Sequence, residues 1–296
     1  MHEAQVVALL IIEQICRLNY SKSQRLADRT RGRRFPSMLW CSHVQILLTN
    51  DDGIYAPGLA AMQRELAKMG DVCVVAPATE QSGVAHSITY LSPLIAKEVY
   101  DNDRCRGWAV EGSPADCVKI ALAEFCPRRP DLVISGINGG LNAGINVLYS
   151  GTVAAAIEGA FFEITSIAVS LEYDEHPHFD KAARLARGVI EQVLEKKGPE
   201  LQLFNLNIPT RALQEPRGLR VVPIGVTRWG EGFEKRIDPR GRPYFWATGR
   251  TPEPVGEKET DLLALAQGYV TLTALDYDLT RHDMLPRMEA WGLELP

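Results

Sequence analysis

The sequence offers chemistry at three places where an apolar run ends in a short polar cluster. The three segments are QILLTNDDG (45–53), VCVVAPATEQSG (72–83) and DLVISGINGG (131–140). Each is typical of a buried parallel strand that runs into a loop, and open α/β sheets bind ligands just beyond the carboxyl ends of their strands. We therefore expect one crevice to collect Asp51, Asp52, Ser82 and Asn138.

These four side chains offer only oxygen ligands, two of them anionic and two neutral. Such a set suits a hard divalent cation, Mg²⁺ or Mn²⁺, rather than zinc or copper. Two adjacent carboxylates repel each other unless a cation or hydrogen bonds compensate, although a solvated Asp-Asp-Gly turn would explain Asp51 and Asp52 without a ligand. Together, the three clusters predict a metal-dependent hydrolase that acts on an anionic substrate.

A further cluster is suited to bind phosphate. The segment YSGTVAAA (149–156) places Ser150, Gly151 and Thr152 at the expected start of a helix. Free backbone N–H groups and the positive end of the helix dipole attract anions at such a position, and the two hydroxyls add donors. An ordinary N-cap would explain one of the hydroxyls equally well.

A glycine-rich loop and one histidine complete the candidate residues. The loop SGINGGLNAG (135–144) matches neither a dinucleotide fingerprint nor a Walker A loop. Its glycines permit close approach of the backbone and leave Asn138 and Asn142 able to face a ligand. His86 has two interpretations, either a donor to a phosphate oxygen or an ordinary surface histidine.

Composition restricts the partners and the location. The 296-residue chain has a formal net charge of -5, which argues against a binding groove for a nucleic-acid duplex. The apolar run VVALLII (6–12) is too short to span a bilayer, so we expect no membrane partner. The six cysteines include no CxxC pair, which favours free thiols and a cytoplasmic location.

Strand and helix patterns alternate from residue 44 onward, which indicates an α/β fold with a mostly parallel sheet flanked by helices. The expected strands are one that begins near residue 44 and others over residues 72–76, 132–135, 167–171, 201–207 and 269–275. The expected helices cover 57–69, 113–125, 179–197, 261–266 and a stretch that begins at Gly151. We divide the chain into a loosely attached N-terminal extension (1–43), a catalytic core (44–220) and an oligomerisation segment (221–296). Within the last segment, residues 221–249 are expected to form a long β-hairpin with its turn at 238–241.

The ordered set of motifs resembles the SurE family of survival-protein nucleotidases. The matching motifs are TNDDG, VVAP, the SG before a serine-rich turn, GSPADCV, PDLVISGIN and YSGTVAAAIEG, which cover residues 44–171, with looser similarity to about residue 282. The resemblance implies a Rossmann-like core with a projecting C-terminal hairpin, assembled as a homodimer or homotetramer. It also implies a phosphomonoesterase that hydrolyses nucleoside monophosphates with one divalent metal ion per subunit. The extension before residue 42 and Ala274, where the family usually has proline, depart from the pattern.

Carried over position by position, the resemblance matches Asp51, Asp52, Ser82 and Asn138 to the family's metal ligands. It matches Asn142, Ser150 and Thr152 to the phosphate side of the site, and Gly151 lies between the last two.

The mechanism expected from these residues is direct attack by water, with no covalent phosphoenzyme. In it Asp51 and Asp52 hold the metal and one of them accepts the water's proton. Three alternatives remain: a non-catalytic nucleotide-sensing module, a 3′-nucleotidase and an exopolyphosphatase.

Overall fold

The computed structural model describes residues 44–226, 232–248 and 259–295. The strands are β1 (Val44–Thr49), β2 (Gly70–Pro77), β3 (Ala96–Asp101), β4 (Arg104–Val110), β5 (Leu132–Gly139), β6 (Thr165–Leu171), β7 (Leu203–Ile208), β8 (Leu219–Val221), β9 (Phe233–Ile237), β10 (Pro243–Ala247) and β11 (Val270–Leu275). The α-helices are α2 (Pro57–Leu66), α3 (Pro114–Ile120), α4 (Gly151–Phe161), α5 (Phe179–Lys196), α6 (Asp261–Ala266) and α7 (Leu285–Glu289). A π-helical turn, η1 (Ala121–Phe125), continues α3, and 3₁₀ segments form η2 (Gly144–Leu148), η3 (Thr210–Leu213) and η4 (His282–Met284).

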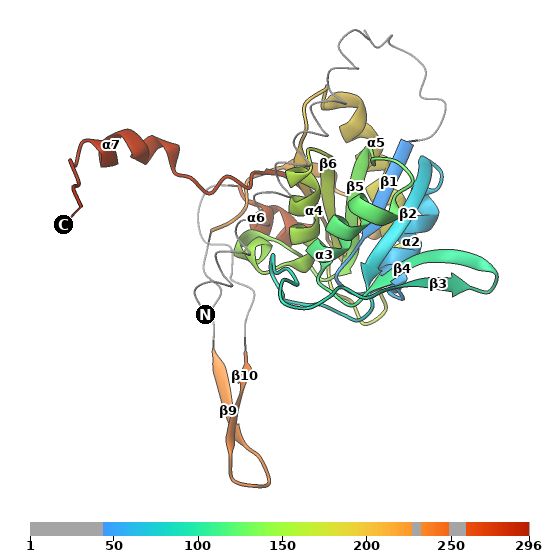
Figure 1. The fold of residues 1–296 in the computed structure, drawn as a ribbon, viewed down its shortest axis with the longest axis horizontal. Helices are drawn as coiled ribbons and strands as arrows, with labels where there is room; N and C mark the ends of the chain where they lie inside the picture. The colour runs from blue at the N-terminus through green and yellow to red at the C-terminus, as the bar shows by residue number, and fades with distance from the viewer. Residues whose placement is uncertain (1–43, 227–231, 249–258, 296) are drawn as a thin grey trace. The chain divides into compact units, whose positions relative to one another are not determined.

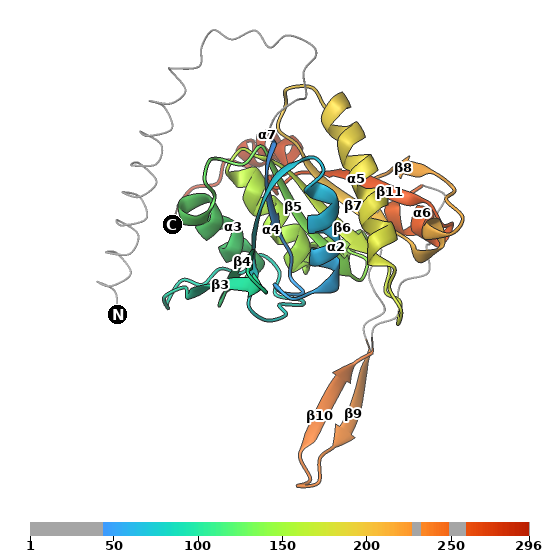
Figure 2. The ribbon, with the colours of Figure 1, turned by 90° about the vertical axis from the view of Figure 1, so that its right-hand side faces the viewer.

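Within the described residues, a nine-stranded sheet is the centre of the fold, and helices cover both of its faces (Figure 1). The helices α3 and α4 pack together on one face, whereas α2 and α5 pack together on the other (Figure 2). This arrangement confirms the predicted α/β fold class. Among the described residues, no helix combines the length and apolar character needed to cross a membrane. Residues 1–43, which the sequence predicts to be a loosely attached extension, lie outside the described residues.

The strand order puts β1 at a topological switch point. The order is β3-β4-β2-β1-β5-β6-β7-β11-β8, and all neighbours from β4 to β7 are parallel. The chain pairs β2 with one side of β1 and later pairs β5 with the other side. Open α/β sheets bind ligands in the crevice that forms where the strand order reverses in this way. Asp51 and Asp52 follow the carboxyl end of β1, so they lie at this switch point.

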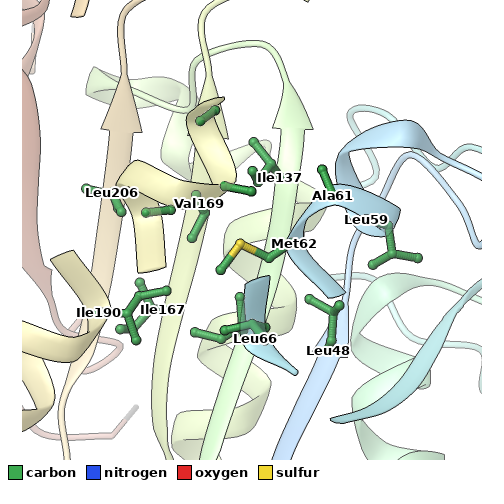
Figure 3. Packing of buried hydrophobic residues seen from close by; sticks show 14 of the residues in the cluster. Leu48, Leu59, Ala61, Met62, Leu66, Ile137, Ile167, Val169, Ile190 and Leu206 are labelled. Carbon is green, nitrogen blue, oxygen red and sulfur yellow. The ribbon is translucent and has the colours of Figure 1, made fainter. Parts of the chain in front are cut away.

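The central strands are buried on both faces, as their continuous apolar runs predict. In β1, Leu48 contributes to the core beneath α2 and α5, whereas Leu47 contributes to the core beneath α3 and α4. Figure 3 shows Met62 and Leu66 of α2 beside Leu48, with side chains of β6 and α5 in the same cluster. The two-sided core holds the carboxyl ends of β1 and β5 in a fixed register.

The start of α3 follows the capping signal in the sequence. The hydroxyl of Ser113 accepts a hydrogen bond from the backbone N–H of Asp116 at 3.1 Å, and the Asp116 carboxylate accepts one from the N–H of Ser113 at 2.9 Å. Pro114 occupies the first turn, where its missing N–H costs no hydrogen bond. The predicted helix start is therefore confirmed.

Strand β5 is longer than the sequence indicates. A strand that ends at Ser135 was expected, but the structure continues β5 to Gly139, and Asn138 pairs with Ser170 of β6. The pairing is irregular between Ser135 and Asn138, where Gly136 has a φ of 134°. This φ lies in a region that residues with a Cβ rarely adopt, so glycine allows the strand to bend and then resume. Asn138 consequently lies at the end of a strand rather than in the following loop.

The β9–β10 hairpin is shorter than residues 221–249. Val221 belongs instead to β8, where it pairs with Leu272 of β11. The hairpin turn lies where it was predicted, since the Asp238 carboxylate accepts hydrogen bonds from the N–H groups of Arg240 and Arg242 at 2.8 and 2.9 Å. Trp229, one of the aromatic residues in the predicted hairpin, lies outside the described residues.

Candidate functional site

Asp51 is bound to the first turn of α4. Its carboxylate accepts hydrogen bonds from the hydroxyl of Thr152 at 2.5 Å and from the backbone N–H of Thr152 at 3.1 Å. Only 4% of Asp51 is exposed, and the positive end of the helix dipole offsets part of the cost of burying a negative charge. The first turn of α4 thus already holds one anion, which belongs to the protein itself.

Asp52 lies beside the end of β5 and is less constrained than Asp51. One oxygen of its carboxylate accepts a hydrogen bond from the backbone N–H of Gly139 at 3.2 Å. This contact joins the polar cluster after β1 to the cluster at the end of β5. Asn50 fixes the turn between β1 and α2. Its side-chain amide donates to the carbonyl of Gly53 and accepts a hydrogen bond from the N–H of Gly53.

The segment that carries Ser82 also reaches the carboxylate pair. The backbone N–H of Gln81 donates to the carbonyl oxygen of Asp51 at 2.8 Å. The hydroxyl of Ser82 is exposed and donates to the carboxylate of Glu80 at 2.6 Å. Glu80 is close enough to raise the pKa of both Asp51 and Asp52, although it is not the largest cause in either case.

The two asparagines of the glycine-rich segment differ in their surroundings. The amide nitrogen of Asn138 donates to the carbonyl of Gly140 at 2.7 Å, and its side chain is partly exposed. Asn142 is buried, and its amide nitrogen donates to the hydroxyl of Ser170 at 2.9 Å. The backbone of Asn142 is held by Asn205 and Asn207 of β7, which both donate to its carbonyl oxygen. Contact of Asn142 with phosphate remains a prediction.

The hydroxyls at the start of α4 have protein partners. Ser150 caps the helix, because its hydroxyl accepts the N–H of Val153 at 3.1 Å, and the hydroxyl of Thr152 donates to Asp51. The N-cap interpretation therefore applies to Ser150. Gly151 lies so close to the site that an added Cβ would be 3.0 Å from the Cβ of Asp51. Its N–H lies in the first helical turn and has no intrahelical acceptor, so it can donate to a ligand.

Asp261 anchors the loop that follows Asn142, and no motif in the sequence pointed to it. Its side chain is fully buried, and one oxygen accepts the N–H of Gly144 at 2.7 Å. The other oxygen accepts the N–H groups of Gly225 and Leu262 at 2.7 and 2.8 Å. A single carboxylate therefore connects the loop that follows Asn142, the segment after β8 and the start of α6.

Replacing Asp261 with asparagine is expected to lower the free energy of unfolding by about 2–4 kcal/mol. In asparagine, an NH₂ group replaces one of the two oxygens that accept backbone N–H groups. The N–H donors on that side would then be buried without an acceptor. Asp174→Asn is a matched control, because Asp174 is exposed and accepts one backbone N–H, from His176. Urea unfolding of both variants measures the difference, and equal midpoints would contradict the anchoring role.

The charge balance of the site favours a cation. Burial raises the pKa of Asp51, and the hydrogen bonds from Thr152 only partly oppose this rise. Burial and the neighbouring charge of Asp51 raise the pKa of Asp52 to about 6. Both carboxylates are therefore less stable in their ionised forms than ordinary aspartates, and a bound cation would reverse that penalty.

The donor set fits a hard divalent cation. The contacts of Asp51, Asp52 and Gln81 bring the ends of β1, β2 and β5 together, so carboxylate, hydroxyl and amide oxygens lie on adjoining segments. In the part of the chain that the structure describes, no three His, Cys, Asp or Glu side chains cluster as a metal site would require. The set proposed from the sequence has only two such side chains, and its other ligands are neutral oxygens.

Comparison with known proteins finds a matching family model, similar sequences and a similar solved structure. The family model described as "Survival protein SurE" matches residues 46–231. The 5′-nucleotidase SurE of Rhodopirellula baltica is 55% identical over 251 residues, which cover 84% of this chain and 99% of that protein. The 5′-nucleotidase SurE of Syntrophobacter fumaroxidans is 42% identical over 84% of this chain and 100% of its own length. The crystal structure of the SurE protein of Aquifex aeolicus matches with a TM-score of 0.74 and 36% identity, over 84% of this chain and 100% of that chain.

The fold and the site define an α/β protein with two adjacent carboxylates at the switch point of its sheet. The chain belongs to the survival protein SurE family, as the family model and the identities over most of its length show. The resemblance inferred from the motifs is thereby confirmed.

Proposed function

We propose that the protein is a metal-dependent 5′-nucleotidase, which hydrolyses nucleoside 5′-monophosphates to nucleosides and phosphate. The observation that carries the proposal is the Asp51–Asp52 pair at the end of β1, in contact with the first turn of α4 and with Gly139. The 5′-nucleotidase names of the relatives support the choice of substrate.

One Mg²⁺ or Mn²⁺ ion per subunit would be held by Asp51, Asp52, Ser82 and Asn138. When bound, such an ion polarises a phosphate oxygen and lowers the pKa of a coordinated water. Asp51 would be kept in place as a ligand by the hydrogen bond from the backbone N–H of Thr152. Among the described residues, Asp52 accepts one hydrogen bond, from the N–H of Gly139, and its other oxygen would accept the proton of the attacking water.

The first turn of α4 would stabilise the charge of the phosphate. The N–H of Gly151 donates to a phosphate oxygen, and the hydroxyl of Thr152 can turn from Asp51 to the substrate once a cation compensates the carboxylate. Ser150 keeps the helix start in place through its N-cap bond, and Asn142, whose amide nitrogen donates to Ser170, would add a donor from the adjoining loop. Water would attack the phosphorus directly as its bond to the nucleoside O5′ breaks, and the leaving oxygen would take up a proton from solvent, so no covalent phosphoenzyme would form.

A panel of phosphate esters tests the proposal and separates it from its alternatives. Purified full-length protein with Mn²⁺ is expected to release phosphate from 5′-AMP, 5′-GMP, 5′-CMP and 5′-UMP. Turnover of 3′-AMP or polyphosphate in addition would assign the 3′-nucleotidase or exopolyphosphatase activity. Binding of the monophosphates without any phosphate release would instead identify a nucleotide-sensing module.

We further propose that the β9–β10 hairpin mediates assembly into a homodimer or homotetramer in the cytoplasm. The cross-strand register places Phe233, Ile237 and Phe245 on one face of the hairpin, and their side chains are 69%, 67% and 59% exposed. Exposed apolar surface of this kind is typical of a protein–protein interface.

The variant Phe245→Glu is therefore expected to shift the sedimentation coefficient to that of a smaller species, because a charge would have to be buried in the interface. Arg236→Ala, on the other face of the same hairpin, is the control and should sediment as the wild type does. An unchanged assembly state in Phe245→Glu would point to a different interface.

A further inference from the structure

His86 is bound to α4 rather than free on the surface. Its Nε2 lies 2.7 Å from a carboxylate oxygen of Glu158, whose side chain is only 5% exposed. The ring also stacks on Phe161, with ring centroids 5.3 Å apart and an interplanar angle of 18°. Glu158 and Phe161 both belong to α4, whose first turn binds Asp51. His86 is therefore a hydrogen-bond partner of a buried carboxylate, a role that neither interpretation from the sequence includes.

The segment around His86 has little structure of its own. Residues 78–95 form neither helix nor strand, and most of their side chains are exposed. Backbone contacts tie the segment at several points: Gln81 N–H donates to Asp51, Ala85 N–H donates to Tyr149 at 3.1 Å, and the carbonyl of Ser87 accepts the hydroxyl of Ser113 at 2.6 Å. His86 adds a side-chain bond from this segment to the middle of α4.

The partner of His86 strengthens this bond. A carboxylate buried as deeply as that of Glu158 requires hydrogen bonds or opposite charges. Lys119 of α3 lies 3.4 Å from one oxygen of Glu158, and His86 occupies the other. Since the side chain of Lys119 is 45% exposed and its contact is longer, His86 supplies the closer and better shielded partner.

We infer that His86 is a positioning residue for Ser82. They lie four positions apart in the sequence, and the bond to Glu158 fixes the segment to the same helix that fixes Asp51. The Gln81 N–H bond to Asp51 holds the segment on one side of Ser82, and the His86–Glu158 bond holds it on the other side. Ordering a ligand before the metal binds removes an entropic cost of binding. This inference rests on the proposed function in one respect, the role of Ser82 as a metal ligand.

The expected effect is weaker metal binding with little change in the chemical step. Loss of a residue that orients a metal ligand typically lowers metal affinity by about 10–100-fold. We expect that loss in His86→Ala and in Glu158→Gln, and we expect kcat at saturating Mn²⁺ to stay within about threefold of the wild-type value. His86→Gln should restore most of the affinity, because its amide nitrogen can still donate to Glu158.

The experiment combines Mn²⁺ titration calorimetry with hydrogen–deuterium exchange of the metal-free protein. His86→Ala should exchange faster than the wild type across residues 79–90, and its Mn²⁺ dissociation constant should rise by the stated factor. His176→Ala is the matched control, because His176 is exposed and its backbone N–H, which the substitution keeps, donates to Asp174. Melting temperatures verify that each variant is folded, and Glu158→Gln carries the test if His86→Ala does not fold.

The outcomes separate this inference from the proposed function. An unchanged Mn²⁺ dissociation constant in His86→Ala, beside a wild type that binds Mn²⁺, overturns the positioning role alone. A wild type that binds no Mn²⁺ overturns the proposed function and, with it, the ligand role of Ser82. Faster exchange together with weaker Mn²⁺ binding, both reversed in His86→Gln, supports the inference.

Discussion

Replacing Asp52 with asparagine is expected to lower kcat/KM for a nucleoside 5′-monophosphate by about 10³-fold or more. The substitution removes an anionic metal ligand and the proposed proton acceptor together, and removing one preorganised electrostatic group alone typically costs 10²–10³-fold. Asp52 is a cleaner target than Asp51, because Asp51 also holds the first turn of α4 through Thr152. Phosphate release at saturating Mn²⁺ measures the effect.

Asp52→Asn should still fold without metal, and the pKa of Asp52 determines the direction in which its melting temperature changes. The pKa is raised from 3.8 to about 6, so the folded protein binds the proton more tightly than the unfolded chain does. Below pH 4 the group is protonated in both states and contributes nothing, whereas above pH 6 its ionised form destabilises the metal-free fold. Asparagine removes that penalty, so the melting temperature in EDTA at pH 8 should be equal to or higher than that of the wild type.

Asp71→Asn is the control for Asp52→Asn. Asp71 is exposed near the start of β2, at the opposite end of the strand from the site, and its substitution should leave both turnover and melting temperature unchanged. Full turnover in Asp52→Asn at saturating metal would remove the carboxylate pair from the mechanism.

Replacing Gly151 with alanine is expected to lower kcat/KM by about 10–100-fold, because small displacements of reacting groups have effects of this size. The added Cβ would lie 3.0 Å from the Cβ of Asp51 and 3.1 Å from Cγ of Pro114. These contacts are too short, so Asp51 and the first turn of α4 would have to move apart by a few tenths of an ångström. The metal ligand and the phosphate donor would then no longer share their present geometry.

Gly188→Ala separates this local effect from a general effect of glycine substitution. Gly188 lies within α5, and an added Cβ there would meet no atom within 4 Å. The substitution should raise the free energy of unfolding by about 0.5–1 kcal/mol and leave turnover unchanged. A Gly151→Ala variant with wild-type kcat/KM would show that the close approach of α4 to Asp51 has no role in catalysis.

The sequence predicts the parts of this site that depend on local pattern. Continuous apolar runs identify β1, β2 and β5, and in parallel strands their carboxyl ends must meet at one edge of the sheet. The capping box at Ser113 and the helix start at Gly151 follow from residue types at fixed spacing. Such features need only a few neighbouring residues, so they can be recognised without knowledge of the tertiary structure.

The remaining features depend on contacts between distant residues. The bond between Thr152 and Asp51 joins residues that are 101 positions apart, and the bond between His86 and Glu158 joins residues 72 positions apart. Asp261 could not be recognised, because its partners are backbone N–H groups, which any residue except proline supplies. The continuation of β5 to Asn138 depends on the backbone conformation of Gly136, which the glycine permits but does not require.

The most direct test of the central claim is phosphate release from 5′-AMP by the wild-type protein after chelation and metal addition. Turnover should vanish in EDTA and return with Mg²⁺ or Mn²⁺ in excess, since the proposed ligands are all oxygen atoms. Turnover that persists after complete removal of divalent ions, or that returns with zinc alone, would contradict the assignment of Asp51 and Asp52 to a hard-metal phosphomonoesterase site.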